Sequence, residues 1–329
     1  MNGITLGRRS LLAAATTLAS PVPWCRAADR GKPLRLLTNW FAQAEHGGFY
    51  QAQALGLYDK AGIDAVIGMG GAQVNTVQLL LAGQCDVALA QPEQVLDGIA
   101  HGLPLVAVAT TFQKGIGGLL AHPDITDLAQ LRGHPILISP EGRITYWPWL
   151  RARYGFTDDQ AAPYTFNIQP FLFNPRLAMQ AFATSEPYAV QQRHVPYRFF
   201  LLADAGYPGF GNMLVTTRAT LAARGAALAA FLHASMTGWK DVLTGDAAPA
   251  RRAIMAANPQ MTADQIDWSF AELRRLQAVA APGQYIGRFD PAAWQRIRDR
   301  DIVTGLIPAS LDWRSAFTTE FDSAMDVTL

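Results

Sequence analysis

The sequence has few cysteines, few charges and no excess of either sign of charge. Its 329 residues include two cysteines, and 27 basic residues stand against 26 acidic ones. So few thiols exclude a disulfide framework, and the balanced charge argues against a nucleic acid or another polyanion as partner. After residue 27 no apolar run approaches the roughly 20 residues of a membrane-spanning helix. We therefore expect the mature protein to be soluble.

The sequence also lacks common motifs of hydrolytic, redox and metal chemistry. There is no Gly-x-Ser-x-Gly turn, no His-Glu-x-x-His helix and no Cys-x-x-Cys pair. The six histidines are scattered without the spacing of metal ligands. Cys85 lies in an apolar strand candidate, where a thiol is usually core filler. We accordingly expect no metal, no cofactor and no catalysis.

The N-terminus has the outline of an export signal. Arg8 and Arg9 directly precede an apolar run, residues 11–18, that is too short to span a bilayer. Prolines and then the small pair Ala27-Ala28 follow, so we predict a twin-arginine signal peptide over residues 1–27 and a periplasmic mature protein. Cleavage would remove three arginines and no acid, which leaves 24 basic and 26 acidic residues. An uncleaved anchor or a chance arginine pair is the alternative.

From residue 33 onward, short apolar runs alternate with helical segments, which indicates an α/β protein with mostly parallel sheets. We predict a first unit with strands at 34–38, 65–67, 86–90 and 105–109 and helices at 42–60, 74–82 and 93–100. A second unit has predicted strands at 136–138, 164–167 and 199–202 and helices at 147–154 and 176–182. A strand at 213–217 then leads back to helices at 221–243, 250–257, 263–276 and 291–305.

The chain thus crosses from one α/β unit into another and returns. This predicts one lobe from residues 33–112 and 213–329 and a second lobe from residues 113–212, joined by two crossing segments. A small solute is expected to bind in the cleft between the lobes. The glycine-rich stretch 206–211 lies at the second crossing, where hinge, ligand contact and plain turn all stay open.

Several segments resemble a known family. They are 37–40 (Leu-Thr-Asn-Trp), 45–50 (Glu-His-Gly-Gly-Phe-Tyr), 55–64, 79–87 and 185–188 (Ser-Glu-Pro-Tyr). Their order is similar to periplasmic binding proteins of ABC importers for thiamine pyrimidine precursors, and to the related alkanesulfonate, taurine and nitrate binders. The resemblance implies a type II periplasmic-binding-protein fold, a small-molecule ligand and an ABC permease of the inner membrane as partner.

One branch of that family is an enzyme, a eukaryotic pyrimidine synthase that consumes its own histidine. His46 falls at the histidine position, but residues 206–217 contain none of the cysteines that this branch carries there. We therefore predict a binding protein that is not an enzyme. An enzyme of pyrimidine synthesis on the same fold is the alternative.

Ligand groups in an α/β lobe gather at the carboxyl ends of the strands. In the first lobe, this rule predicts contacts from Asn39, Trp40, Gly71, Gln73, Gln91 and Glu93. Trp40 is suited to stack on a planar solute, the alternative being a core tryptophan. His46 and Tyr50 are one helical turn apart and are predicted to share a face toward the ligand. The glycine pair 47–48 between them indicates a close approach by ligand, by the opposite lobe or by tight packing.

In the second lobe, the predicted contacts are Ser139, Gly142, Arg143, Thr145, Tyr146, Glu186, Tyr188 and Tyr207. A helix start near Ser139 with Arg143 beside it suits a carboxylate, sulfonate or phosphate, unless Arg143 is simply solvated. Glu186 would accept from an amine or ring N–H, or cap a helix, and Tyr188 would give a second stacking face. The expected solute is a heteroaromatic compound similar to a thiamine pyrimidine precursor; a small sulfonate or other anion is the competitor. We expect a monomer.

Overall fold

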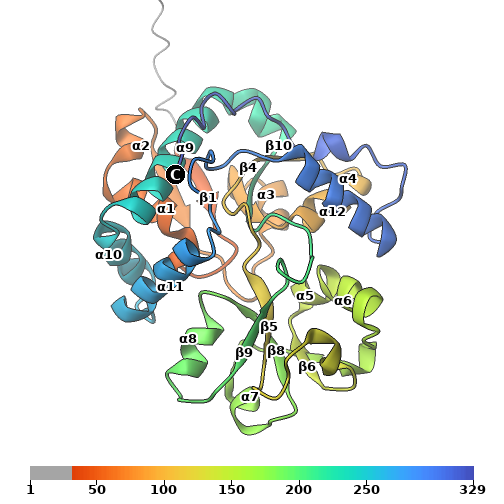
Figure 1. The fold of residues 1–329 in the computed structure, drawn as a ribbon. Helices are drawn as coiled ribbons and strands as arrows, with labels where there is room; N and C mark the ends of the chain where they lie inside the picture. The colour runs from red at the N-terminus through yellow and green to blue at the C-terminus, as the bar shows by residue number, and fades with distance from the viewer. Residues whose placement is uncertain (1–31) are drawn as a thin grey trace, which may run out of the picture.

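The computed structural model describes residues 32–329, and its core is two five-stranded sheets set one above the other (Figure 1). The upper body in Figure 1 contains both the first and the last parts of the chain, and the smaller lower body contains the middle part. The signal peptide predicted over residues 1–27 lies outside the described residues. The chain has the α/β architecture with two bodies that was predicted.

The first sheet has the strand order β2-β1-β3-β10-β4 and the second has the order β7-β6-β8-β5-β9. The strands of the first sheet are β1 (Leu34–Leu37), β2 (Ala65–Gly68), β3 (Val87–Ala90), β4 (Leu105–Thr110) and β10 (Met213–Thr217). Those of the second are β5 (Gly117–Ala121), β6 (Ile136–Ile138), β7 (Ala161–Pro163), β8 (Ala178–Phe182) and β9 (Arg198–Leu201). Every residue of β3 and β4 is buried, as expected of strands covered on both faces.

Each sheet has four strands that run the same way and one that is reversed. In the first sheet β1 is parallel to β2 and β3, whereas β10 is antiparallel to β3 and β4. In the second sheet β6 is parallel to β7 and β8, whereas β5 is antiparallel to β8 and β9. The reversed strands β5 and β10 are the first strands after each crossing, where no crossover helix turns the chain back for parallel pairing. The prediction of mostly parallel sheets is confirmed, and the strand predicted at 213–217 is β10, whereas β5 was not predicted.

Helices cover the sheets of both bodies (Figure 1). The first body begins with η1 (Ala44–His46), α1 (Gly47–Ala54), α2 (Leu57–Lys60), α3 (Thr76–Leu81) and α4 (Pro92–Ala100). The second body carries η2 (Leu128–Leu131), α5 (Pro140–Ile144), α6 (Trp147–Tyr154), η3 (Asp158–Gln160), α7 (Gln169–Phe173) and α8 (Glu186–Gln191). The chain ends with α9 (Arg218–Thr244), α10 (Ala248–Ala257), α11 (Ala263–Arg275), α12 (Pro291–Val303) and η4 (Trp313–Ala316). None of the helices within residues 32–329 combines the length and apolar character that a membrane crossing requires.

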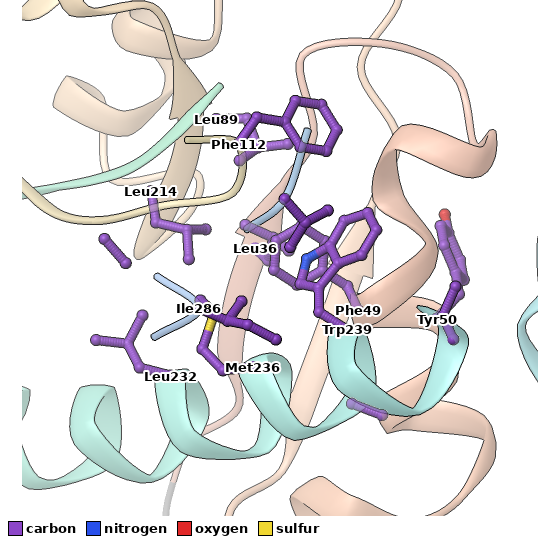
Figure 2. Packing of buried hydrophobic residues seen from close by; sticks show 14 of the residues in the cluster. Leu36, Phe49, Tyr50, Leu89, Phe112, Leu214, Leu232, Met236, Trp239 and Ile286 are labelled. Carbon is purple, nitrogen blue, oxygen red and sulfur yellow. The ribbon is translucent and has the colours of Figure 1, made fainter. Parts of the chain in front are cut away.

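The main core lies where α9 crosses α1 beside the first sheet (Figure 2). Trp239 of α9 is fully buried, and its ring lies 6.2 Å from Phe49 and 5.8 Å from Phe112. A Cβ at Gly48 would lie 2.2 Å from Cγ of Trp239, and one at Gly47 would lie 2.5 Å from the ring of Phe270. The two glycines are therefore explained by tight helix packing and not by a ligand.

Three predicted elements of secondary structure were wrong. The helix predicted over 176–182 is the strand β8, because a short apolar run does not distinguish a buried strand from a buried helix. The strand predicted over 164–167 lies earlier, as β7, and Phe166 has a left-handed φ of 61° that no strand allows. The helix predicted over 42–60 is broken into η1, α1 and α2, with Gly56 at φ 63° before α2.

Two segments connect the bodies, residues 111–116 between β4 and β5 and residues 202–212 between β9 and β10. Lys114 of the first segment forms an ion pair with Asp204 of the second, with 2.6 Å between Nζ and Oδ1. The two connections therefore run together, and they leave the facing edges of the sheets free to enclose a cavity.

Candidate functional site

A cavity of about 310 Å³ lies between the two bodies and is lined by side chains from both of them and from the connecting segments. Eleven of the sixteen residues predicted from the sequence line it. These are Asn39, Trp40, His46, Gln91, Glu93, Ser139, Gly142, Thr145, Tyr146, Glu186 and Tyr207. The cavity is thus where the carboxyl ends of strands from the two sheets face each other.

In the first body, the lining comes from the turns after β1 and β3. Asn39 follows β1, and its Nδ2 donates to Oδ1 of Asn212 over 3.2 Å. Gln91 follows β3, and its Nε2 donates to the same oxygen over 2.6 Å. Gln91 also forms a capping box with Gln94 at the start of α4, where Pro92 fits the first turn. These contacts hold two amide side chains at the wall of the cavity.

Trp40 lies at the boundary between the two bodies. It is half-buried, and its ring centroid lies 4.5 Å from that of Phe166 in the second body. Both rings line the cavity. A planar solute in the cavity therefore has an indole face available from one body and a phenyl ring from the other.

In the second body, Gln180 of β8 organises the turn after β6. Its Oε1 accepts from the backbone N–H of Ser139 over 2.5 Å and from Oη of Tyr146 over 2.9 Å. Ser139 in turn caps α5 by accepting from the N–H of Gly142. A Cβ at Gly142 would lie 2.5 Å from Oη of Tyr146, so the close approach of this ring requires glycine.

Glu186 is held at the start of α8 with its carboxylate against the cavity. Oη of Tyr164 donates to Oε1 over 3.1 Å, and the backbone N–H of Phe182 donates to Oε2 over 2.8 Å. Burial raises the pKa of Glu186, although both hydrogen bonds oppose the rise. Glu186 is therefore positioned by neutral donors alone.

Glu93 belongs to a different arrangement. Oη of Tyr207 donates to its Oε1 over 2.6 Å, and Nη2 of Arg300 lies 2.5 Å from the same oxygen. Arg300 is also paired with Asp301 of α12 and donates to the carbonyl of Pro208 in the second connecting segment. This buried network ties α4, α12 and the connecting segment together, and it neutralises Glu93.

His46 lines the cavity with an almost completely buried ring, 1% exposed. Neither ring nitrogen makes a hydrogen bond of good geometry with a described residue, although the backbone of Phe41 lies close enough to act on the pKa of the ring. Burial lowers the pKa of His46 to about 3, so the imidazole is neutral. The ring therefore presents an unpaired acceptor and donor next to the cavity.

Five predicted residues do not line the cavity. Tyr50 is packed in the main core, and the Cβ that Gly71 lacks would meet the ring of Phe41 at 3.1 Å. Gln73 is exposed. Arg143 donates through Nη2 to the carbonyl of Ala161, and the ring of Tyr188 packs 5.4 Å from that of Trp268. Each of these side chains has a structural contact or faces solvent instead.

The sequence reasoning missed other lining residues, and they include two glutamates. Glu45 is 4% exposed, and its Oε1 accepts from Oγ1 of Thr184 across the two bodies. Burial raises the pKa of Glu45 to about 7, and the charge of Glu186 adds to the rise. Glu141 follows Pro140 in α5 and is exposed to the cavity. Enclosure by protein raises the pKa of Glu141 to about 7, and the charge of Glu93 adds to the rise. Further missed lining residues are Gln43, Phe112, Tyr164, Phe166, Gln180, Phe182, Ser185, Phe210 and Asn212.

Within the described chain, no group of three or more His, Cys, Asp or Glu residues is arranged to hold a metal ion. Cys85 is buried, and burial raises the pKa of its thiol to about 11, followed by the effect of the charge of Asp86. A thiol with such a pKa is a poor nucleophile near neutral pH. The polar groups of the cavity are thus suited to hydrogen bonding and charge recognition.

A family model described as NMT1/THI5 like matches residues 43–247, which is more than half of the chain. The chain belongs to the NMT1/THI5-like family. The matched residues include the His46 turn, all of the second body and all of α9. No curated protein sequence shows a significant match to the whole chain.

Solved structures with the same fold are similar to this NMT1/THI5-like protein over most of their length. The aliphatic sulphonate binding protein SsuA of Escherichia coli has a TM-score of 0.64 at 15% identity, over 87% of this chain and 92% of that one. The alkanesulfonate-binding protein SsuA of Xanthomonas axonopodis pv. citri gives 0.65 at 15% identity, over 88% and 99%. The nitrate-binding protein NrtA of Synechocystis PCC 6803 gives 0.62 at 15% identity, over 89% and 88%. At these identities the similarity establishes the fold.

Proposed function

We propose that this protein is the substrate-binding component of a bacterial ABC importer and that it captures a small heteroaromatic solute between two lobes. The observation that carries the proposal is the cavity, which is walled from both bodies by aromatic rings and polar side chains. Membership of the NMT1/THI5-like family and neighbours described as periplasmic sulfonate- and nitrate-binding proteins support the transport class. A solute that contacts both walls favours the closed arrangement of the lobes.

The lining favours a heteroaromatic solute over a small anion. None of the described residues that line the cavity is a lysine or an arginine, and Arg143, the cation expected near an anion, binds the Ala161 carbonyl instead. A sulfonate or nitrate would meet glutamate side chains with no cation in direct reach. A flat ring with N–H groups would stack on Trp40 and donate to Glu186.

Delivery and location complete the proposal. Export of the mature protein by the twin-arginine route would place it in the periplasm, as a monomer that docks on a permease of the inner membrane. We place the lobe boundaries at residues 33–112 with 213–329 and at residues 113–212, so that each lobe contains one sheet. Closure about the two connecting segments would then hold the touching rings of Trp40 and Phe166 against the solute.

A thermal-shift screen of residues 28–329 tests the proposal. The panel comprises the aminopyrimidine precursor of thiamine, other heteroaromatic amines, flavins, alkanesulfonates and nitrate. A ligand at 100 times its Kd stabilises the folded state by about 2.7 kcal/mol, which is readily seen as a higher midpoint. A shift with heteroaromatic compounds supports the proposal, and shifts confined to sulfonates or nitrate would contradict the heteroaromatic part.

The stacking role is tested with Trp40→Ala. Loss of one aromatic stacking partner costs about 1–3 kcal/mol, so we expect the Kd of a heteroaromatic ligand, measured by calorimetry, to rise by about 5- to 150-fold. Trp268→Ala is the matched control, because Trp268 packs on Tyr188 away from the cavity and should leave the Kd unchanged. Equal affinities of the two variants would remove Trp40 from the site.

The distinction from an enzyme is made with the same ligand. A binding protein returns the solute unchanged after hours of incubation, and the mass of the peptide that contains His46 stays constant. Conversion of the solute, or a modified His46, would establish the enzyme alternative on this fold.

A further inference from the structure

The cavity has an unbalanced charge, and this feature extends the proposed function to the class of solute. Four glutamates line it: Glu45, Glu93, Glu141 and Glu186. No lysine or arginine is among the described lining residues, and His46 is neutral. If all four carboxyl groups were ionised, the cavity wall would carry four negative charges with only one compensating cation behind it.

That cation, Arg300, is shared between Glu93 and Asp301. Its Nη2 lies 2.5 Å from Oε1 of Glu93 and 2.8 Å from Oδ1 of Asp301, so it has no charge left for another carboxylate. Two cations next to cavity-lining residues in the sequence are also engaged, since Arg143 donates to a carbonyl and Lys114 is paired with an aspartate at 2.6 Å. The protein therefore supplies no positive charge to the other three glutamates.

Those three glutamates have only neutral hydrogen-bond partners, and none forms an ion pair with a described residue. Glu45 accepts from a threonine hydroxyl, and Glu186 accepts from a tyrosine hydroxyl and a backbone N–H. Glu141 is exposed to the cavity itself. Keeping such enclosed carboxyl groups ionised costs free energy unless a positive group comes close to them.

A second observation, independent of the acids, indicates a ligand at the same place. The His46 ring is 1% exposed and lines the cavity, yet neither of its nitrogens makes a hydrogen bond of good geometry with a described residue. A buried, unpaired imidazole costs free energy that a bound N–H donor would recover. His46 directly follows Glu45 in η1, and both residues line the cavity.

The aromatic rings fit the same kind of ligand. Trp40, Tyr146, Phe166 and Tyr207 line the cavity. Aromatic faces attract organic cations through their quadrupoles, and more strongly where water is excluded. Rings and carboxylates together thus favour a group that is both flat and positively charged.

We infer that the transported solute is an organic cation, an aromatic or heteroaromatic compound with a protonated amine or amidine, whose N–H groups bind Glu45, Glu141 and Glu186. This inference rests on the proposed function and narrows it. The ring packs against Trp40 and Phe166 where these two side chains line the cavity, and the charged nitrogen lies against the glutamates. Recognition therefore depends on charge as well as on shape.

Three aromatic probes of nearly equal size separate charge from shape: benzamidine is a cation, benzamide is neutral and benzoate is an anion. Binding to the mature protein is measured by calorimetry and thermal shift at pH 8. We expect benzamidine to bind at least tenfold more tightly than benzamide, and benzoate not to bind. Benzamide or benzoate binding as tightly as benzamidine, or no binding of benzamidine, would overturn the inference.

Glutamine variants assign the preference to the cavity. Glu141→Gln keeps the shape of an exposed side chain, so it should fold and should lower the benzamidine preference at least fivefold. Glu320→Gln is the matched control, because Glu320 is exposed in the C-terminal segment away from the cavity, and it should behave as the wild type. An unchanged preference in both Glu141→Gln and Glu45→Gln would also overturn the inference.

The two levels of the proposal fail differently. If neutral heteroaromatic compounds of the first screen bind and benzamidine does not, the charge inference is wrong and the binding function remains. If no compound of any charge binds, the proposed function itself fails.

Discussion

Replacement of Glu45 by glutamine is expected to change how the stability of the protein depends on pH. Glu45 is 4% exposed, and burial raises the pKa of its carboxyl from 4.5 to about 7. The folded state therefore favours the protonated carboxyl, and the stability that this provides is complete below pH 4.5 and is lost as the pH rises through 7. The groups that act on Glu45 are the hydroxyl of Thr184, whose hydrogen bond opposes the rise, and the carboxyl of Glu186, which adds to it.

The size of the effect follows from these two pKa values. Between pH 5 and pH 8 the contribution of Glu45 to the free energy of unfolding falls by about 2.5 kcal/mol. Each pH unit over which the folded state binds one proton more than the unfolded state changes that free energy by about 1.4 kcal/mol. Glutamine cannot ionise, so Glu45→Gln loses this part of the pH dependence. At pH 8 the variant should approach or exceed the stability of the wild type.

Urea unfolding of ligand-free protein, followed by tryptophan fluorescence at pH 5 and pH 8, measures the effect. The comparison is the change in unfolding free energy between the two pH values, in wild type, Glu45→Gln and the exposed control Glu320→Gln. Wild type and Glu320→Gln should lose the same unfolding free energy between pH 5 and pH 8, and Glu45→Gln should lose about 2.5 kcal/mol less. If all three agree to within about 0.5 kcal/mol, Glu45 ionises as in water and the reasoning is refuted.

Two further predictions concern the scaffold. Gly48→Ala would place a methyl group 2.2 Å from Cγ of Trp239, and we expect a loss of about 1–3 kcal/mol in urea unfolding, whereas Gly225→Ala in α9, with no atom within 4 Å of the new Cβ, should be neutral or stabilising. A Gly48→Ala variant as stable as Gly225→Ala would contradict the packing described. Arg300→Met would leave two buried carboxyl groups without their cation, and we expect a loss of about 3–5 kcal/mol, against less than about 1 kcal/mol for Arg296→Met at an exposed ion pair. Equal unfolding midpoints for the two arginine variants would show that the buried network does not stabilise the fold.

Local sequence rules located the parts of the cavity that depend on strand ends. Asn39, Trp40, Gln91 and Glu93 follow β1 and β3 directly, and the carboxyl ends of parallel strands necessarily meet at one edge. The same rule failed for Gly71, because the turn after β2 packs on Phe41 and leaves the cavity. Strand-end reasoning thus predicts the edge of the sheet, but not how far each turn extends over it.

The failure at Tyr50 has a specific cause. The prediction assumed one continuous helix through His46, but η1 ends at His46 and α1 begins at Gly47. The tighter 3₁₀ turn rotates His46 relative to the helix that follows, so i,i+4 spacing no longer places the two side chains on one face. His46 consequently reaches the cavity while Tyr50 enters the core.

Glu45 and Asn212 show what a single sequence leaves open. Glu45 adjoins His46 in the sequence. Its carboxyl is held by a hydrogen bond from Thr184, which is 139 positions away and in the other body. Asn212 accepts from Asn39 and Gln91 only because the second connecting segment returns beside β3. Such contacts follow from the path of the chain in space, which local periodicity does not encode.

Some of the residues proposed to bind the solute also form contacts between the two bodies. Glu45 of the first body is bonded to Thr184 of the second, and the Trp40 ring lies 4.5 Å from the Phe166 ring. A cation bound to Glu45 stabilises the ionised form of a carboxyl that is already at the interface, and a ring packed against Trp40 and Phe166 contacts both bodies. Binding free energy is therefore available to closure at the points where the bodies meet, so a solute that lacks either the charge or the ring stabilises the closed state less. Selection by charge and selection by shape then act through the same conformational change.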